Sequence, residues 1–242
     1  MDKEGEPYGD SNNQQNKVWN YYQNRFPESF EGARPRLDYI IKEISKKTNK
    51  PTPRVLNIGA GSGYFEETSK RLGWDICSLD PDADTVKKLN KKGVKGYIGY
   101  IEMMPFDDES FDFVVASEVL EHLNDEKFHR GIREVFRVIV QDGWFLGTVP
   151  YCENLRLNQV VCPKCGEVFH RWGHIQSFDS ELIKSLLSPY FLVEKIVERP
   201  FPNWFTMNWK GKVQAFASML LYYFGIHGSN ENVFFIATKS SE

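Results

Sequence analysis

Two patterns of apolar and polar residues alternate along the middle of the chain. Short, almost wholly apolar runs, such as residues 55–58 and 111–117, are followed by longer stretches in which apolar residues recur every three or four positions. Runs of the first kind predict buried strands, and stretches of the second kind predict helices that bury one face. Repeated alternation of the two predicts an α/β fold, in which a largely parallel, doubly wound sheet carries helices on both faces.

The charges within the expected helices support this interpretation. Glu66 and Glu67 begin the first helix of the alternating region, and basic residues end it just before Gly73, which suits the helix dipole and a glycine stop. We expect strands over residues 55–58, 75–79, 96–101, 111–117 and 144–149, and helices over residues 64–72, 82–92 and 125–139.

The chain on either side of this alternation differs in composition. The first residues are rich in Asn, Gln and acidic side chains, which predicts disorder, and the part after Pro150 departs from strict alternation. We expect a disordered tail over residues 1–16, a helical cap over 17–52 with a helix at 36–47, and one domain over 53–242 with insertions at 151–174 and 199–230. The last elements of that domain are a helix over residues 180–187 and strands over 191–197 and 233–238.

The composition excludes several classes of protein. The 242 residues have a formal net charge of -3, which gives no electrostatic attraction to nucleic acid. The sequence has no uncharged apolar run of the roughly 20 residues that a bilayer-spanning helix requires, and its polar N-terminus lacks the apolar core of a signal peptide. We therefore expect a soluble, cytoplasmic protein that does not bind nucleic acid, and the sequence leaves its oligomeric state open.

A glycine-rich loop follows the first expected strand. Gly59, Gly61 and Gly63 are separated by single residues and precede an expected helix. Glycines at such a turn let a ligand approach the backbone closely, and the free N–H groups there point at the ligand. The spacing differs from the Gly-x-Gly-x-x-Gly of dinucleotide-binding folds, which disfavours a nicotinamide-dependent oxidoreductase.

An acidic residue ends the second expected strand. From that position Asp80 can accept hydrogen bonds from both hydroxyls of a ribose. The alternative is that Asp80 caps the helix that follows, although Asp82 and Asp84 are also available for that role. The loop and Asp80 together indicate a ligand that contains a nucleoside.

Several segments in order resemble a known enzyme family. The glycine loop and Asp80 are followed by residues 99–107, Gly-Tyr-Ile-Glu-Met-Met-Pro-Phe-Asp, and by residues 110–123, which contain the run Ser-Glu-Val-Leu-Glu-His. Over roughly residues 53–150 these segments resemble class I S-adenosylmethionine-dependent methyltransferases, of the group that acts largely on small molecules. The resemblance implies a Rossmann-like, seven-stranded sheet that is mostly parallel with an antiparallel last strand.

The resemblance also implies a role for each matching residue, with S-adenosylmethionine as the cofactor. The chain departs from the family pattern at Asn57 and Tyr100, where an acidic residue is common, so a catalytically inactive copy of the fold is an alternative. The methionine part of the cofactor is expected at Asn57, Gly59, Ala60, Gly61, Ser62 and Gly63, the ribose at Asp80 and Pro81, the adenine at Ile101, Glu102 and Met103, and the pocket wall at Glu118, Val119 and His122.

Two histidines are candidates for catalysis. Methyl transfer is an in-line displacement, so the protein mainly aligns the reactants and excludes water. A hydroxyl acceptor also needs a base to remove its proton, and His122 and His174 are the candidate catalytic residues. For His122 the alternative is a structural histidine behind the fourth strand. Glu121 is expected to be a solvated or helix-capping acid.

A cluster of cysteines and histidines lies in the first insertion. Cys162 and Cys165 form a Cys-x-x-Cys turn, and His170 and His174 follow at a spacing that one helical turn would place on one face. These four side chains suit tetrahedral zinc, which would be structural and would hold an insertion that has no core of its own. Since the resemblance puts a histidine of the acceptor pocket at His174, Cys152 is the alternative fourth ligand.

Aromatic and apolar residues gather towards both ends of the chain. In the second insertion, residues 213–226 form an apolar run that is too short to span a bilayer. It is expected to fill the core; a lid over the acceptor pocket and a shallow membrane contact beside Lys210 and Lys212 are the alternatives. Cover over the cofactor is expected from four N-terminal aromatic residues, Trp19, Tyr21, Tyr22 and Phe26.

The sequence thus predicts an enzyme that transfers a methyl group from S-adenosylmethionine to a small-molecule, glycan or lipid-intermediate acceptor. One alternative is a zinc-stabilised binding module on a methyltransferase fold that has lost catalysis. A nicotinamide-dependent oxidoreductase is the other alternative, disfavoured by the loop spacing. The acceptor itself is not predicted, because acceptor pockets are built from insertions such as residues 151–174 and 199–230.

Overall fold

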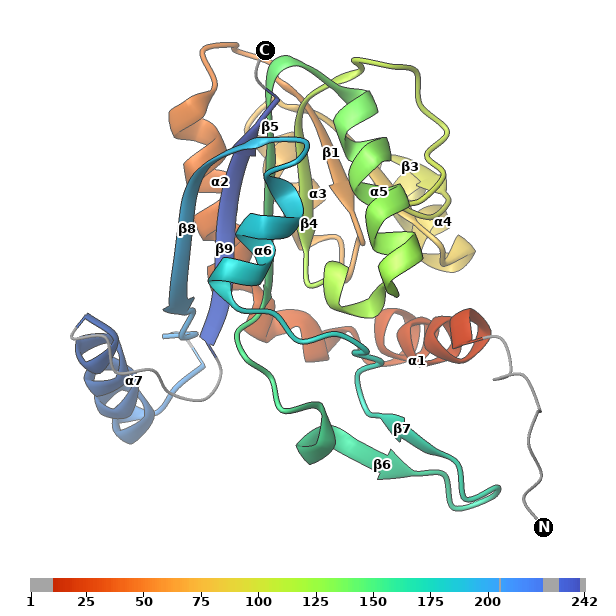
Figure 1. The fold of residues 1–242 in the computed structure, drawn as a ribbon, viewed down its shortest axis with the longest axis vertical. Coiled ribbons are helices and arrows are strands. Elements are labelled where there is room, and N and C mark those ends of the chain that lie inside the picture. Colours follow the sequence, from red (N-terminus) through yellow and green to blue (C-terminus); the bar gives the residue numbers. More distant parts are fainter. Residues whose placement is uncertain (1–10, 205, 224–230, 240–242) are drawn as a thin grey trace.

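A single seven-stranded sheet forms the centre of the molecule, in a computed structural model that describes residues 11–204, 206–223 and 231–239 (Figure 1). Its strands are β1 Arg54–Ile58, β2 Asp75–Asp80, β3 Lys95–Ile98, β4 Phe111–Ser117, β5 Ile139–Pro150, β8 Leu192–Pro200 and β9 Glu231–Thr238. They lie in the order β3-β2-β1-β4-β5-β9-β8. Neighbours from β3 to β5 pair in parallel, and β9 is antiparallel to both β5 and β8.

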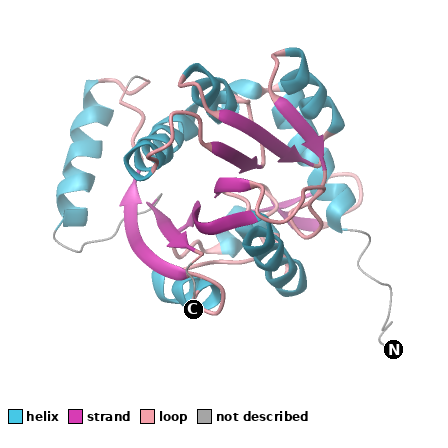
Figure 2. Cartoon of the chain, turned by 90° about the horizontal axis from the view of Figure 1, so that it is seen from above, coloured by secondary structure: helices cyan, strands magenta, loops and turns pink. Residues whose placement is uncertain are grey.

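Helices cover both faces of this sheet (Figure 2). Those described are α1 Ser11–Arg25, α2 Arg34–Lys47, α3 Tyr64–Arg71, α4 Ala83–Lys91, α5 Asp125–Val138, α6 Ser180–Leu187 and α7 Trp209–Tyr223, with short 3-10 turns at Pro27–Ala33, Leu120–His122 and Leu155–Asn158. Core residues of α5 and α6 pack on one face of the sheet, and core residues of α2, α3 and α4 pack on the other.

The alternation of side chains along a strand explains these two layers. In β1, Val55 points to the layer that contains Ile40 of α2, and the next residue, Leu56, points to the layer that contains Ile132 of α5. Both residues of β1 are fully buried, as a strand covered on both faces requires. The expected doubly wound α/β sheet, mostly parallel with an antiparallel last strand, is therefore confirmed.

The order of the strands creates a crevice at one edge of the sheet. From β1 the chain proceeds outwards to β2 and β3, and it then returns to the other side of β1 to form β4 and β5. Parallel strands end at the same edge, and ligands of open α/β sheets bind where the strand order reverses. The carboxyl ends of β1 and β4 mark that point here.

Several elements differ from their expected limits, and three of these differences bear on the site. β3 ends at Ile98, so Ile101 lies in the turn that follows rather than in the strand. β5 begins at Ile139, directly after α5, and the expected turn is an irregularity within the strand, where Asp142 has a positive φ of 59° and the pairing with β4 shifts register. α1 begins at Ser11, so the tail expected over residues 1–16 is wrong from there on; residues 1–10 lie outside the described part of the chain.

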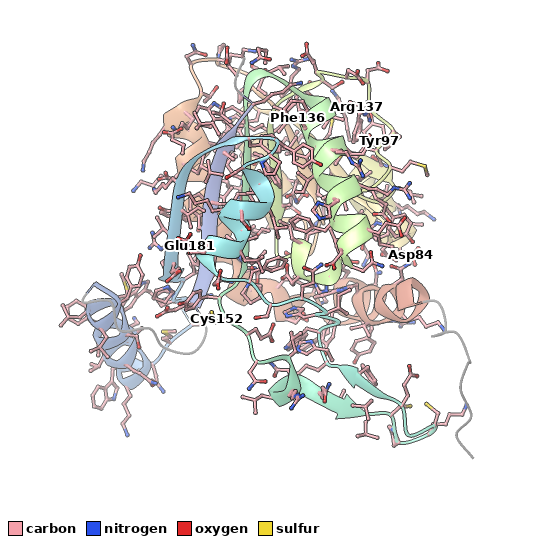
Figure 3. All side chains as sticks on the ribbon, in the orientation of Figure 1. Asp84, Tyr97, Phe136, Arg137, Cys152 and Glu181 are labelled. Carbon is pink, nitrogen blue, oxygen red and sulfur yellow. The ribbon has the colours of Figure 1, made fainter. Side chains whose placement is uncertain are left out.

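The first insertion is a β-hairpin and not the expected helical turn. β6 Gln159–Val161 pairs antiparallel with β7 Val168–His170, and this two-stranded ribbon extends away from the sheet (Figure 1). Cys152, at the point where the chain leaves β5 for the hairpin, is exposed (Figure 3). The second insertion contains α7, which lies outside β8 (Figure 1).

Candidate functional site

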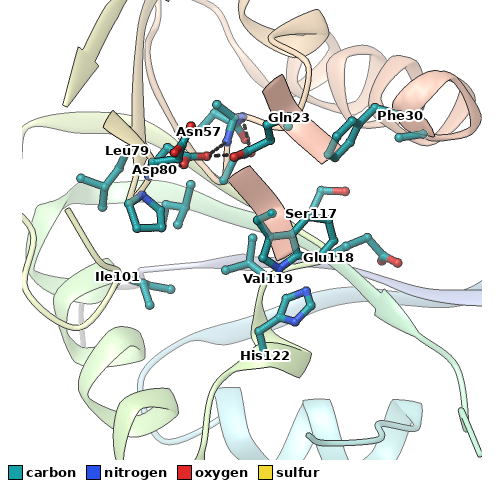
Figure 4. Close-up of a pocket in the computed structure, with 18 of the residues that line it drawn as sticks. Gln23, Phe30, Asn57, Leu79, Asp80, Ile101, Ser117, Glu118, Val119 and His122 are labelled. Carbon is teal, nitrogen blue, oxygen red and sulfur yellow. Dashed lines mark hydrogen bonds between the residues drawn. The ribbon is translucent and has the colours of Figure 1, made fainter. Parts of the chain in front are cut away.

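A cavity of about 500 Å³ opens where the carboxyl ends of β1, β2 and β4 meet (Figure 4). Trp19, Tyr22 and Gln23 of α1 contribute to its wall, so the N-terminal helix covers it. Tyr21 and Phe26, which were expected to join this cover, are at least half exposed. The cavity is lined by these residues of the expected site: Asn57, Gly59, Ala60, Gly61, Ser62, Asp80, Pro81, Ile101, Glu102, Glu118, Val119, His122 and His174.

Two residues of the expected cofactor site are not part of this lining. Gly63 is the N-cap of α3 and adopts a left-handed φ of 83°, so its role is to turn the chain into the helix. Met103 is 73% exposed and lies in the turn after β3. Gly63 and Met103 were predicted as site residues because they lie next to lining residues in the sequence.

The glycine loop presents bare backbone to the cavity. Gly59 and Gly61 have φ values of +81° and +53°, which residues with a side chain adopt at a cost. A Cβ on Gly59 would lie 2.9 Å from Cγ2 of Val119, and one on Gly61 would lie 3.2 Å from the ring of Phe30. Gly59 is therefore required by the close approach of Val119 as well as by its backbone conformation, and a side chain at Gly61 would be crowded by Phe30.

Asp80 lies at the cavity wall with its carboxylate partly engaged. Oδ2 accepts hydrogen bonds from the Ala60 N–H at 2.8 Å and from the Gln23 amide at 3.0 Å, and Oδ1 accepts one from the Asp82 N–H at 2.9 Å. Burial raises the pKa of Asp80 by more than these hydrogen bonds lower it. A carboxylate has about four acceptor positions, so one remains on Oδ1.

The helix-capping alternative for Asp80 is not observed, because its neighbour takes that role. Asp82 is the N-cap of α4 and accepts a hydrogen bond of 2.8 Å from the Thr85 N–H. Its carboxylate also accepts hydrogen bonds from Asn20 and Asn24 of α1, at 2.6 and 2.8 Å. Asp82 therefore anchors the covering helix and leaves Asp80 to face the cavity.

A buried acid that sequence reasoning missed supports the glycine loop from behind. The Asn57 amide donates hydrogen bonds to Oε1 of Glu66 at 2.7 Å and to the Gly59 carbonyl at 3.1 Å. The Ser78 hydroxyl donates to the same Glu66 oxygen at 2.8 Å. Burial raises the pKa of Glu66 to about 7. The sequence could have indicated that Glu66 is buried, because it lies on the same helix face as Phe65 and Ser69, which are also buried.

On the side of the cavity where adenine is expected, the wall is apolar and aromatic. Ile101 is only 3% exposed and packs against Gly131 of α5, where a Cβ would lie 3.0 Å from it. Tyr100, which replaces the acid common in the resembled family, accepts a hydrogen bond of 2.9 Å at its hydroxyl from Asn16. α1 thus contacts this side of the cavity as well.

Glu118, at the carboxyl end of β4, is held by its own chain. It adopts a positive φ of 57°, and its N–H donates to the Thr148 carbonyl at 2.9 Å. Its Oε1 accepts hydrogen bonds from Thr148 Oγ1 and Asn232, both at 3.0 Å, and Nη1 of Arg36 lies 3.7 Å from Oε2. Glu118 therefore has a fixed orientation at the cavity.

Glu121 and His122 follow in a short 3-10 turn, in which Glu121 is buried and His122 is half-buried. The expectation that Glu121 is a solvated or capping acid is wrong, because it has no exposed surface; burial raises its pKa well above the usual value. Nδ1 of His122 lies 3.1 Å from the Gly173 carbonyl and donates to it. Burial lowers the pKa of His122 to about 3, so this ring is neutral at physiological pH.

His174 reaches the cavity from the base of the hairpin. Its Nδ1 makes a short hydrogen bond with Oε2 of Glu153, and its Nε2 lies 3.9 Å from Oε1 of Glu121. The hydrogen bond to Glu153 assigns the proton to Nδ1 and leaves a lone pair on Nε2. Glu153 was missed because it lies 21 residues away in sequence with no motif around it.

His170 packs behind this pair. Its ring stacks on the ring of His174, with 4.7 Å between centroids and an interplanar angle of 21°. Nδ1 of His170 accepts the backbone N–H groups of His174 at 3.1 Å and of Trp172 at 3.3 Å. The ring proton is therefore on Nε2, which lies 3.3 Å from Oε1 of Glu153. The two histidines do meet, but through a turn at Gly173 and not along a helix.

The expected zinc ligand set is not assembled. Among the described residues, two groups bring three possible ligand atoms within 4.8 Å of one another: Glu121 with His122 and His174, and Glu153 with His170 and His174. Neither group contains Cys162, Cys165 or Cys152, so the described residues do not support the expected shared Cys/His site.

The extended geometry of the hairpin strands explains why the cysteines and the histidines do not meet. Cys162 and Cys165 form the turn at the tip of the hairpin, closed by the hydrogen bond from the Gly166 N–H to the Cys162 carbonyl at 2.9 Å. His170 pairs with Gln159 at the other end of the ribbon. An extended strand rises roughly 3.3 Å per residue, which carries His170 away from the two thiols.

Part of this chain is similar in sequence to known methyltransferases. A family model described as a methyltransferase domain matches residues 56–147. The uncharacterized methyltransferase YcgJ of Bacillus subtilis is 33% identical over 100 residues, which are 38% of this chain and 39% of that protein. The mitochondrial ubiquinone biosynthesis O-methyltransferase of Rattus norvegicus is 27% identical over 72% of this chain and 56% of its own length. This chain therefore spans less than two thirds of each of these relatives.

Solved structures share the fold. The 1,6-didemethyltoxoflavin-N1-methyltransferase of Burkholderia thailandensis superposes with a TM-score of 0.66 and 14% identity, over 98% of this chain and 93% of that one. An S-adenosylmethionine-dependent methyltransferase of Methanosarcina mazei superposes with a TM-score of 0.61 and 16% identity, over 82% of this chain and 98% of that one. At such identities the likeness concerns the fold alone.

Proposed function

This chain carries a methyltransferase domain on the fold of S-adenosylmethionine-dependent methyltransferases, and we propose that it transfers a methyl group from S-adenosylmethionine to a hydroxyl of a small molecule. The observation that carries the proposal is the cavity in which a bare glycine loop faces Asp80. Its volume of about 500 Å³ lies within the range typical of small-molecule sites, roughly 300–1,000 Å³.

The residues present fit such a cofactor. Gly59 and Gly61 keep the loop free of side chains where Cβ atoms would close the approach. Asp80 retains an acceptor position on Oδ1, and displacement of the Gln23 amide would open a second on Oδ2, which suits the two hydroxyls of a ribose. Ile101 and Tyr100 offer an apolar and aromatic wall for a flat base.

We assign the cofactor-binding role to the residues that line this part of the cavity. When bound, S-adenosylmethionine supplies a methyl group that is already activated on a cationic sulfur. Asn57 and the loop would hold the amino-acid end, where the side-chain oxygen of Asn57 takes the place of the carboxylate common in the resembled family. Glu102, Pro81 and Val119 would complete the wall, and the N-terminal helix would exclude water.

His174 is our candidate for the general base. Its ring lines the cavity, its Nε2 has a lone pair, and the proton on Nδ1 is held by the carboxylate of Glu153. As the acceptor oxygen forms its bond to the methyl carbon, the bond from that carbon to sulfur would break and its electron pair would stay on sulfur. Nε2 would take the hydroxyl proton, and the negative charge of Glu153 would stabilise the resulting imidazolium. His122 is a poor base, since burial lowers its pKa to about 3 and its ring therefore binds a proton only weakly, and we assign it a role in shaping the wall.

The names of some relatives support methyl transfer to an oxygen atom. Two of them are named ubiquinone biosynthesis O-methyltransferases, from Rattus norvegicus and Pelagibacter ubique. These names describe those proteins, and a small-molecule hydroxyl acceptor for this chain is our inference from them and from the Glu153–His174 pair. A zinc-stabilised module without catalysis and a nicotinamide-dependent oxidoreductase find no such support.

The test is an acceptor screen with the full chain. We would incubate it with S-adenosylmethionine that carries a tritiated methyl group and with panels of small phenols, amines and thiols, and identify the products by mass spectrometry. We expect O-methylated products, and loss of at least about 100-fold in their rate for His174→Gln, since a general base contributes roughly 10²–10⁴-fold. Products methylated only on nitrogen or sulfur would refute the hydroxyl acceptor.

A further inference from the structure

α7 stands out from the rest of the molecule by where its apolar residues point. It lies outside β8, and its least exposed described residues are Gly211, Ala215 and Tyr222. At 100° per residue these three fall on one side of the helix, which is the side that faces the body of the protein. The opposite side faces away from it.

That outward side is a stripe of large apolar residues. Trp209, Val213, Phe216 and Leu220 are 72%, 61%, 64% and 51% exposed. Their spacing of three and four places them within an arc of about 60°, opposite the side that contacts the body. A folded chain rarely presents such a stripe to water, so this outward stripe calls for a partner.

Two lysines flank the outward stripe. Lys210 lies about a quarter turn to one side of it and Lys212 about a quarter turn to the other. Residues 209–223 contain no Asp or Glu, so the helix is purely cationic. An apolar stripe between lysines, with a Trp at one end, is the pattern of a helix that lies in the interface of a bilayer with anionic headgroups.

We propose that α7 docks this protein on the surface of an anionic lipid bilayer. Within the described residues, no helix is long and apolar enough to cross a membrane, so α7 would lie along the surface. A second copy of the chain is the less suitable partner, because a stripe paired with itself would bring lysines together without an acid on either helix. The proposal does not depend on methyl transfer.

The topology relates this surface to the cavity. β8 is antiparallel to β9, which is antiparallel to β5, so β8 and β5 run in the same direction. α7 follows the carboxyl end of β8, and the cavity opens at the carboxyl ends of β1 and β4, which belong to the same edge of the sheet (Figure 1). Docking through α7 would therefore bring the edge that contains the cavity close to the lipid surface.

The experiment is co-sedimentation of the full chain with vesicles of phosphatidylcholine alone and of phosphatidylcholine with phosphatidylserine. We expect the protein to pellet with the anionic vesicles, at least about tenfold more strongly than with the neutral ones, because each lysine near such a surface contributes roughly 1 kcal/mol. High salt should reduce that preference, since it shortens the screening length.

Two leucine variants distinguish membrane binding through the outward stripe from binding through any exposed apolar residue. Leu220→Glu should abolish the sedimentation, and Leu157→Glu, at an 81% exposed leucine near the hairpin, should leave it unchanged. Circular dichroism of both variants checks that they fold. Recovery of the wild type in the supernatant with both vesicle types would overturn the proposal, and so would equal effects of the two variants. A dimer in sedimentation velocity that Leu220→Glu dissociates would show that a second copy, and not lipid, covers the stripe.

Discussion

The side-chain amide of Gln23 donates a hydrogen bond of 3.0 Å to Oδ2 of Asp80, across 57 positions of the chain. Through this contact the N-terminal helix reaches the end of β2 and covers the cavity. Gln23 occupies one of the acceptor positions that a ribose hydroxyl would use, so cofactor binding and the position of α1 should be coupled.

Asp80→Asn should weaken binding of S-adenosylhomocysteine by about 10- to 100-fold, because hydrogen bonds to a charged group contribute roughly 1.5–3 kcal/mol each. The measurement is isothermal titration calorimetry. Asp84→Asn is the control, since this acid is exposed on α4 (Figure 3). Equal affinity of the wild type and the Asp80 variant would contradict the ribose-binding role.

Gly59→Ala should destabilise the loop more than an equivalent change elsewhere. The new Cβ would meet Val119 at 2.9 Å, in addition to the cost of a positive φ. Gly73→Ala isolates the second effect, because Gly73 has a φ of +84° and a Cβ added there would meet nothing within 4 Å. We expect about 1–2 kcal/mol of lost stability for Gly73→Ala in urea denaturation, and a larger loss for Gly59→Ala. The reverse order would show that the loop is not crowded.

Glu153→Gln should lower kcat for O-methylation by about tenfold or more, since the amide cannot stabilise an imidazolium at His174 as the carboxylate does. The affinity for S-adenosylhomocysteine should stay the same. Because Glu153 acts through His174, the acid limb of the kcat pH profile should also move, which loss of structure alone would not produce.

The control for this variant is Glu167→Gln, at the exposed tip of the same hairpin. It should leave both kcat and the pH profile unchanged. A Glu153→Gln enzyme with lower kcat but an unaltered profile would assign Glu153 a purely structural role.

Glu66 should make the protein less stable as the pH rises. Its pKa is raised by burial from 4.5 to about 7 in the folded state, so the folded chain holds this proton more tightly than the unfolded chain. The stabilisation is complete below the unfolded value and is lost as the pH rises through about 7. Between about pH 5.5 and about pH 8.5 the loss amounts to about 2 kcal/mol.

Glu66→Gln should remove that loss, because the amide keeps a neutral acceptor for Asn57 and Ser78 at every pH. Urea denaturation of the wild type and the variant at both pH values gives the difference. Glu67→Gln, at the neighbouring exposed acid, is the control. The same pH dependence in the wild type and the Glu66 variant would mean that Glu66 is charged in the folded protein.

Local patterns were sufficient to predict the sheet and one side of the site. The strand expected over residues 111–117 matches the observed limits of β4, Phe111–Ser117, because most of its residues form an apolar run that is buried on both faces of the sheet. The glycine loop and Asp80 lie close together because each follows a neighbouring parallel strand. These relations need only the order of strands, which the alternation predicts.

The contacts that the sequence did not predict join residues far apart in the chain. Gln23 meets Asp80 only because α1 folds back over the sheet, and Glu153 meets His174 only because the hairpin returns the chain to its base. The Cys-x-x-Cys spacing of Cys162 and Cys165 suggested zinc with the two histidines that follow, but β7 is extended and separates them. No local rule distinguishes a helical turn from a strand of three residues there.

A crystal structure of the protein with S-adenosylhomocysteine tests the central claim most directly. The account predicts the ribose against Asp80, with the Gln23 amide displaced from Oδ2, the amino-acid end over Gly59 and Gly61, and the adenine beside Ile101. A structure grown at saturating ligand in which this cavity holds no nucleoside, or holds it away from Asp80, would contradict it.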